Sequence, residues 1–167
     1  AMRHLALRRQ LAAGLDAARV PGPPVAPDSL DGEVACVDLE TTGGSAGFHR
    51  IIEIGIVRMR AGEIIDEWSS LVNPGTRIPT AIEAFTGITG AMVADAPRFA
   101  DLADEVRGRL EGRLFVAHNA RFDYGFLRRE YQSLGQTFRS RLLCSVRLSR
   151  RLHPDERGHS LDAVMAR

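Results

Sequence analysis

The sequence predicts an α/β domain in which helices cover both faces of a mixed β-sheet, preceded by an N-terminal helix. Three apolar, strand-like segments follow one another at residues 33–40, 50–60 and 63–72, which is typical of an antiparallel meander. After residue 97, helical and strand-like patterns alternate, as they do when helices pack on a sheet. The 167 residues suffice for one domain with a substantial core.

Composition narrows the class of protein further. No apolar run approaches the roughly 20 residues that a membrane-spanning helix needs, so we expect no membrane partner. The two cysteines, Cys36 and Cys144, form no CxxC pair, which favours a reducing, cytoplasmic setting over a disulfide framework or a zinc site. The net charge of +1 does not by itself indicate a nucleic-acid-binding protein.

The first 30 residues differ in character from the rest. Leu7, Leu11 and Leu15 recur at helical spacing, so residues 3–19 are predicted to form a helix. Four prolines between residues 21 and 27 then predict a stiff, extended connector. We therefore divide the chain into residues 1–30, the N-terminal helix and connector, and residues 31–167, the main domain.

The three strands of the meander are bounded by clear signals. In residues 33–40 both alternating sets are apolar up to Asp38, which is typical of a central strand covered on both faces. Residues 50–60 are almost as apolar, and Ala61-Gly62 turns the chain into the third strand. Asn73-Pro74-Gly75 ends that strand.

The second half of the domain alternates. Residues 78–93 are predicted to mix loop and helical turn, broken at Thr86-Gly87, and residues 97–110 to form an amphipathic helix. Residues 113–118 form a short strand, and Asn119 is predicted to cap a helix that runs to about residue 134. A fifth strand is predicted at residues 141–146, and a further helix from residue 160.

Asp38 and Glu40 are the first candidates for chemistry. Residues two apart in a strand point the same way, so their carboxylates share a face with Cα atoms roughly 7 Å apart. Like charges that close raise each other's pKa, and a divalent cation such as Mg²⁺ or Mn²⁺ removes the conflict. The alternative is a solvated strand terminus without function.

Asp123 is the third candidate carboxylate. It falls one turn into the helix that Asn119 starts, where the helix dipole favours an anion and where Phe122 and Phe126 anchor one side. It could equally be a surface acid that only complements the dipole. Residues 78–93 offer either an apolar shelf on which a nucleobase could stack or a turn that covers the sheet edge.

Four segments, VDLETTG, RIIEIGIV, IEAFTGIT and VAHNARFDYGFL, occur in this order along residues 33–167. Together they resemble the DEDDh 3′–5′ exonucleases, in particular the proofreading epsilon subunit of bacterial DNA polymerase III. The resemblance implies a ribonuclease-H-like five-stranded mixed sheet, two Mg²⁺ or Mn²⁺ ions, and release of nucleoside monophosphates from the 3′ end of DNA.

Roles carried over by position are implied by the same resemblance. Asp38 would bridge both metal ions, Glu40 would bind the ion that holds the nucleophilic water, and Asp123 would support the second ion. The pair of ions would stabilise the attacking and leaving oxygens. The implied substrate-binding residues are Thr41, Thr42, Ile82, Phe85, Thr86, His118, Asn119 and Phe122.

The sequence departs from the family pattern at its last motif, a general-base His and a fourth Asp spaced His-x4-Asp. His159 and Asp162 are spaced His-x2-Asp and lie too early in the motif order, so we set them aside. We expect either that the sequence stops before this motif or that the protein is a variant without it. A positioned general base is worth about 10²–10⁴-fold, so we expect slow hydrolysis by this chain.

Several alternatives remain open at this point. The implied partner is a single-stranded or frayed 3′ end of DNA, with a DNA polymerase subunit or a fused C-terminal domain as a further partner. An RNA 3′ exonuclease of the same superfamily would have the same fold and metals. A non-catalytic module that binds a polymerase or nucleic acid would explain the missing motif.

Overall fold

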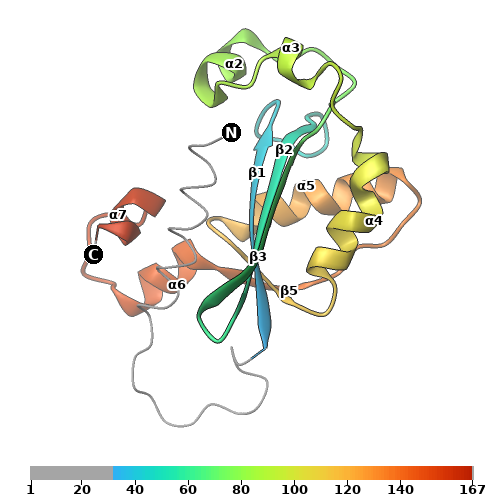
Figure 1. Cartoon of the computed structure of the whole chain (residues 1–167). Helices are drawn as coiled ribbons and strands as arrows, with labels where there is room; N and C mark the ends of the chain where they lie inside the picture. Colours follow the sequence, from blue (N-terminus) through green and yellow to red (C-terminus); the bar gives the residue numbers. More distant parts are fainter. Residues whose placement is uncertain (1–31, 167) are drawn as a thin grey trace.

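The computed structural model describes residues 32–166, and the predicted helix at residues 3–19 and its connector lie outside this range. The described chain forms one five-stranded sheet in the order β3-β2-β1-β4-β5 (Figure 1). β1 runs antiparallel to β2 and parallel to β4, so the sheet is mixed, as predicted. The strands are β1 (Glu33–Thr41), β2 (Ile51–Arg60), β3 (Glu63–Leu71), β4 (Leu114–Ala117) and β5 (Arg141–Cys144).

Six helices are described around this sheet among residues 32–166. They are α2 (Thr80–Thr86), α3 (Gly90–Val93), α4 (Phe99–Leu110), α5 (Ala120–Ser133), α6 (Ser145–Leu152) and α7 (Leu161–Met165). None of the helices in residues 32–166 is long and apolar enough to cross a bilayer.

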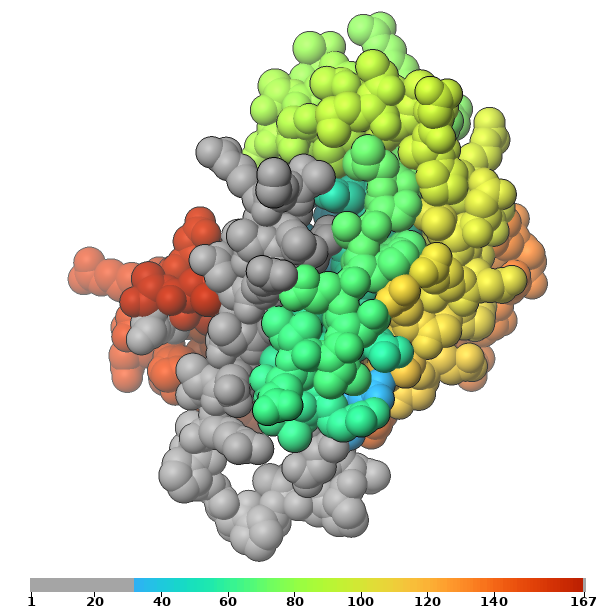
Figure 2. All heavy atoms as spheres, in the orientation of Figure 1, coloured from blue at the N-terminus to red at the C-terminus, as the bar shows by residue number. Residues whose placement is uncertain are grey.

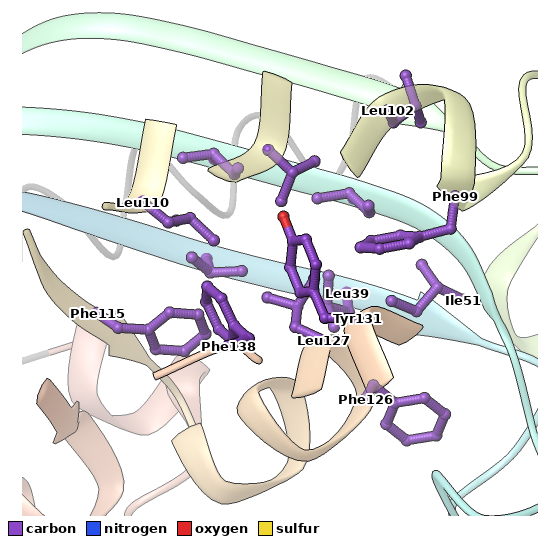
Figure 3. Packing of buried hydrophobic residues seen from close by; sticks show 14 of the residues in the cluster. Leu39, Ile51, Phe99, Leu102, Leu110, Phe115, Phe126, Leu127, Tyr131 and Phe138 are labelled. Atoms are coloured by element: carbon purple, nitrogen blue, oxygen red, sulfur yellow. The ribbon is translucent and has the colours of Figure 1, made fainter. Parts of the chain in front are cut away.

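The larger core lies between one face of the sheet and helices α4 and α5. Tyr131 of α5 is at its centre: its ring stacks on Phe138 with a centroid distance of 4.9 Å and meets the edge of Phe99 at 5.1 Å (Figure 3). Its hydroxyl donates to the carbonyl of Ala103 at 2.7 Å. The face of β1 that carries Ala35, Val37 and Leu39 packs against these helices. Both helices are therefore fixed to the central strand.

The opposite face of the sheet carries a second, smaller core. Val34 and Cys36 of β1 pack with Val57, Met59 and Val116, and Leu161 of α7 covers them in part. Ser160 begins α7 as predicted, since its hydroxyl accepts from the backbone N–H of Ala163 at 3.3 Å. Helices thus contact both faces, and the sequence prediction of a two-sided central strand is confirmed.

Helices α2 and α3 form a cap at the end of the sheet where β1 finishes. Ile78, Ile88 and Val93 pack on Ile52 of β2, and Ile51 beside it pairs with Thr41, the last residue of β1. Figure 2 shows this cap above the end of β3, with α4 along the side of that strand. The predicted break at Thr86-Gly87 is confirmed, because α2 ends at Thr86 and Gly87 has a φ of 74°.

Two local predictions were wrong. The fifth strand was expected to continue to residue 146, but β5 ends at Cys144 and Ser145 starts helix α6. Its partner strand β4 ends at Ala117, opposite Cys144, so further strand residues would have no ladder to join. Asn119 precedes α5 as expected, but it adopts a left-handed conformation with φ 76°, and its side chain makes no capping bond.

Candidate active site

Asp38 and Glu40 lie near the C-terminal end of β1, at the end of the sheet beneath α2. Both are half-buried, and they share the face of β1 that carries Val34 and Cys36. Across the antiparallel ladder, Asp38 is opposite Gly55, so no side chain of β2 stands directly across from its carboxylate. The two carboxylates therefore lie on one face near the C-terminal end of β1.

Glu53 is a further acidic residue at this place, and sequence reasoning missed it. It lies directly opposite Glu40 in the ladder and only 2 % of its surface is exposed. Directly opposed side chains lie on the same face of a sheet, so Asp38, Glu40 and Glu53 line one surface. The register between β1 and β2 was needed to find it. Like charges opposed in this way favour a nearby positive charge.

Asp123 reaches the same place from the other side of β1. Its side chain is 4 % exposed, and its Oδ1 accepts a hydrogen bond from the backbone N–H of Leu39 at 3.2 Å. Leu39 lies between Asp38 and Glu40, so the bond fixes Asp123 beside both. Burial raises the pKa of Asp123 well above its usual value, and the negative charges of Asp38 and then Glu40 raise it further. The three predicted acids therefore act on one another.

His118 follows β4 and also lies near Asp38. Its Nδ1 is 2.9 Å from the hydroxyl of Ser145. Burial lowers the pKa of His118, while a hydrogen bond with the backbone of His159 and the charge of Asp38 oppose this decrease. His159 in turn has its Nδ1 2.9 Å from the hydroxyl of Ser149 in α6. His118 thus connects the end of β4 to α6 and to the segment before α7.

Thr41 and Thr42 are buried at the start of the loop that follows β1. The hydroxyl of Thr41 donates to the carbonyl of Gly43 at 2.8 Å, and that of Thr42 accepts from the backbone N–H of Arg50 at 3.0 Å. The structure therefore places both threonines next to the carboxylates and uses their hydroxyls to shape the loop.

The other predicted contact residues divide into two groups. Ile82, Phe85 and Thr86 lie on α2, above the end of β1. Ile82 is half-buried against the cluster around Ile52, Thr86 donates to the carbonyl of Ile82 at 2.8 Å, and Phe85 is 86 % exposed.

The second group lies at the start of α5. Asn119 is exposed, and Phe122 is half-buried with its ring 4.9 Å from that of Phe126. Phe122 thus anchors the first turn of α5, from which Asp123 reaches the carboxylates of β1.

Cys144 is a second feature that sequence reasoning missed. It ends β5, immediately before α6, and it is half-buried. Burial alone would raise the pKa of its thiol. Hydrogen bonds from the backbone of Arg147, Ala120, Asn119 and Val146 outweigh this and lower the pKa. The sulfur is therefore stabilised as a thiolate between the N-termini of α5 and α6.

The donor set suits a hard divalent cation in its chemistry. Asp38, Glu40 and Asp123 supply carboxylate oxygens from rigid elements, which is what Mg²⁺ and Mn²⁺ prefer. Within residues 32–166, no three His, Cys, Asp or Glu side chains are grouped closely enough to hold an ion as they stand. Burial, and after it the charges of Asp38 and Glu40, raise the pKa of Asp123, and a bound cation would favour its ionised form.

The sheet order, the helices on both faces and the acidic end of the central strand define a ribonuclease-H-like exonuclease fold. The sequence profile of this group, described as RNase_T: Exonuclease, matches residues 35–167. The chain therefore belongs to the RNase T/DEDD 3′–5′ exonuclease family, and the resemblance found in the sequence is confirmed. Enzymes of the DEDD family typically use divalent metals.

Proteins with similar sequences are much longer than this chain. A DNA polymerase III of the PolC type from Clostridium perfringens is 36 % identical over 137 residues, which is 82 % of this chain and 10 % of that protein. A DNA polymerase III subunit epsilon-like protein from Rhodobacter capsulatus is 43 % identical over 136 residues, 78 % of this chain and 19 % of that protein. The chain thus spans a tenth to a fifth of these relatives.

Solved structures agree with this assignment. Exonuclease X, in complex with 5′ overhanging duplex DNA, superposes with a TM-score of 0.66 at 31 % identity, over 80 % of this chain and 71 % of that one. Exonuclease I, in a complex titled ExoI/SSB-Ct, gives a TM-score of 0.71 at 15 % identity, over 81 % of this chain and 36 % of that one. The second likeness concerns the fold alone.

Proposed function

We propose that this domain hydrolyses DNA from the 3′ end with the help of two divalent cations, releasing nucleoside monophosphates. The observation that carries the proposal is the hydrogen bond that fixes the buried Asp123 carboxyl on Leu39, between Asp38 and Glu40. Three carboxylates held by two rigid elements are the donor set that a two-metal site requires. Asp38 and Glu40 would be the primary ligands, and Asp123 would support the second ion.

The bound ions would supply Lewis-acid stabilisation of the phosphate and of the attacking oxygen. The chain's own residues orient and enclose the substrate. Thr41 and Thr42 set the course of the loop beside the carboxylates, and their own hydroxyls are held by Gly43 and Arg50. His118 lies beside Asp38, where it forms one wall of the pocket. These positions give the terminal phosphate a fixed approach to the acidic end of β1.

The cap formed by α2 and α3 completes the pocket in this proposal. Phe85 presents an exposed aromatic ring on α2. Ile82 packs the helix against the cluster around Ile52 of β2, and the hydroxyl of Thr86 donates to the carbonyl of Ile82 within the helix. An exposed ring of this kind suits the face of a terminal nucleobase. Asn119 and Phe122 line the opposite side, at the start of α5.

DNA is the proposed substrate because of the relatives. The matched regions belong to DNA polymerase III proteins of the PolC and epsilon-like type, and Exonuclease X was solved with duplex DNA. The same relatives support a proposed role in proofreading or repair, with a polymerase or a further domain as partner. The test must therefore separate DNA from RNA and hydrolysis from binding.

The test is a degradation assay with 5′-labelled single-stranded DNA and RNA of the same sequence, in Mn²⁺ and over long incubations. We expect stepwise shortening of the DNA from its 3′ end and release of mononucleotides. Asp38→Asn should slow this by at least about 100-fold, the scale observed when one preorganised electrostatic group is lost. Asp104→Asn, an exposed acid on α4, is the matched control and should leave the rate unchanged.

Each other outcome overturns part of the proposal. Faster degradation of the RNA strand would make the domain an RNA exonuclease. Tight DNA binding without Mn²⁺-dependent shortening would make it a binding module. Equal rates for the wild-type protein and Asp38→Asn would show that hydrolysis occurs elsewhere or comes from a contaminant.

A further inference from the structure

Phe48 is the most exposed large apolar side chain among residues 32–166, with 88 % of its surface accessible. It lies in the connection between β1 and β2, residues 42–50, which begins two residues after Glu40. An aromatic ring held in water gains free energy when another apolar surface covers it. Such a position close to the carboxylates is therefore suited to contact with a ligand.

The connection that carries Phe48 is tied at its base and near its tip. At the base, the N–H of Thr42 donates to the carbonyl of Arg50 at 2.9 Å, and the N–H of Arg50 donates to the hydroxyl of Thr42 at 3.0 Å. Near the tip, the N–H of His49 donates to the carbonyl of Ser45 at 2.8 Å, and the N–H of Ser45 is 3.1 Å from His49 Nδ1. The backbone around Phe48 is thus a closed turn.

A half-buried ion pair fixes this turn to helix α5. The guanidinium of Arg50 binds both oxygens of Glu130, with Nε–Oε1 at 2.7 Å and Nη2–Oε2 at 2.8 Å. Glu130 is only 5 % exposed, and it lies on the helix that also carries Asp123. A two-pronged pair of this kind holds its partners in one orientation. The backbone that carries Phe48 is therefore tied to the helix that carries Asp123.

The location of Phe48 identifies what can cover it. The β1–β2 connection lies at the end of the sheet beneath α2 and α3 (Figure 1), and Asp38 and Glu40 lie within the last four residues of β1 before it. Phe85, the other nearly fully exposed phenylalanine, lies on α2 at that same end. The two exposed aromatic rings come from separate elements next to one acidic site. A strand that entered this site would therefore come near two exposed aromatic side chains at the same end of the sheet.

We propose that Phe48 is a stacking platform for a nucleobase of the substrate strand, separate from the terminal base that α2 receives. This inference rests on the proposed function and adds a second base contact to it. Stacking on a rigid aromatic ring tolerates any base, because every base has a π-face. The domain would thus grip single-stranded or unpaired 3′ ends without regard to sequence, and bind a strand without bases less well.

The experiment measures the binding of a fluorescein-labelled single-stranded oligonucleotide by anisotropy, in EDTA so that no hydrolysis occurs. Phe48→Ala should weaken binding about 5- to 100-fold, the range reported for the loss of one stacked base. Phe48→Trp should retain the affinity. Ile64→Ala is the matched control, since Ile64 is also exposed but lies at the opposite end of the sheet, next to the turn between β2 and β3, and its loss should change nothing.

A second oligonucleotide with abasic sites in its last four positions separates stacking from other effects. The difference between wild type and Phe48→Ala should disappear on it. In Phe48→Trp the fluorescence of the new indole should be quenched by the normal oligonucleotide and not by the abasic one, with Trp68 as the constant background. This spectroscopic result does not depend on the stability of the alanine variant.

The proposal is overturned if Phe48→Ala binds the normal oligonucleotide as tightly as the wild type does, or if it loses equal affinity for both oligonucleotides. An unquenched indole in Phe48→Trp would contradict it as well. None of these results concerns hydrolysis. The proposed function would instead be contradicted by a rate of DNA degradation that Asp38→Asn leaves intact, so the two failures are distinguishable.

Discussion

Among single residues, Asp123 shows most clearly how the candidate site is held together and how its charges interact. It is fixed by the N–H of Leu39, and it lies within the field of Asp38 and Glu40. Without a cation, the negative charges of Asp38 and Glu40 make the ionisation of Asp123 less favourable. An ionised Asp123 therefore destabilises the metal-free fold, which agrees with its proposed role in supporting a cation.

Replacement of Asp123 tests that cost. Its folded pKa lies above the ordinary value of 3.8, so its contribution to stability is complete below about pH 4 and is lost as the pH rises through the folded pKa. Asp123→Asn should therefore stabilise the metal-free protein at pH 8 by about 1 kcal/mol and have no such effect at pH 4. Thermal unfolding in EDTA at both values measures this. A destabilised variant at pH 8 would contradict the account.

Cys144 provides a second prediction at this scale. Backbone hydrogen bonds lower the pKa of its thiol, whereas burial raises the pKa of Cys36 to about 12. At pH 7.5 iodoacetamide should modify Cys144 in the folded protein much faster than Cys36, because only the thiolate reacts. Peptide mass spectrometry after a timed reaction gives the two rates. Equal rates in the native protein would show that these backbone groups do not stabilise the thiolate.

The sequence was sufficient for some residues of the site and not for others. The alternation of side chains in a strand predicted that Asp38 and Glu40 share a face, and the helix start predicted a fixed Asp123. Glu53 could not be found this way, because its position opposite Glu40 depends on the register between two strands. Cys144 depends on two helix starts that meet only in the folded chain.

At the level of elements, the contact between α4 and α5 fixes the helix that carries Asp123. Tyr131 makes this contact, with its ring between Phe99 and Phe138 and its hydroxyl on the carbonyl of Ala103. At the other end of α5, Phe126 lies in the larger core and Phe122 packs against that core. The helix that carries Asp123 is thus packed into the core at both ends.

Tyr131→Phe tests this support with little change in packing. The variant keeps the ring but leaves the Ala103 carbonyl without this donor, so the free energy of unfolding should fall by about 1 kcal/mol. Urea denaturation measures the loss. Tyr124→Phe is a matched control, because its hydroxyl donates at a longer 3.2 Å to the carbonyl of Phe138 in a less buried place. Equal losses in the two variants would contradict the central role of Tyr131.

The boundaries of a strand or helix were predictable where turn residues or charged residues mark both of its ends. The strands of the meander were placed within one residue, since turns and charged ends bound them. Helix α6 was missed because its start at Ser145 follows a strand without any loop. The end of β5, and with it the start of α6, is set by the end of β4, a partner strand that is distant in sequence. Local patterns cannot contain that information.

At the scale of the whole molecule, the sheet order brings the acidic residues together. β1 lies in the middle, between β2 with Glu53 and β4, whose end leads to His118 and α5. Helices α2 and α3 close the same end of the sheet (Figure 1). The fold class was predictable because the meander and the alternating half each have a distinct pattern. The precise convergence of side chains required the folded chain.

The most direct test of this account is the binding of Mn²⁺, followed by the electron paramagnetic resonance of the free ion. The account predicts saturable binding by the wild-type protein and by Asp104→Asn. It predicts strong loss of binding in Asp38→Asn, Glu40→Gln and Asp123→Asn, because the three carboxylates share the ions. Binding that survives all three substitutions unchanged would contradict the proposed site.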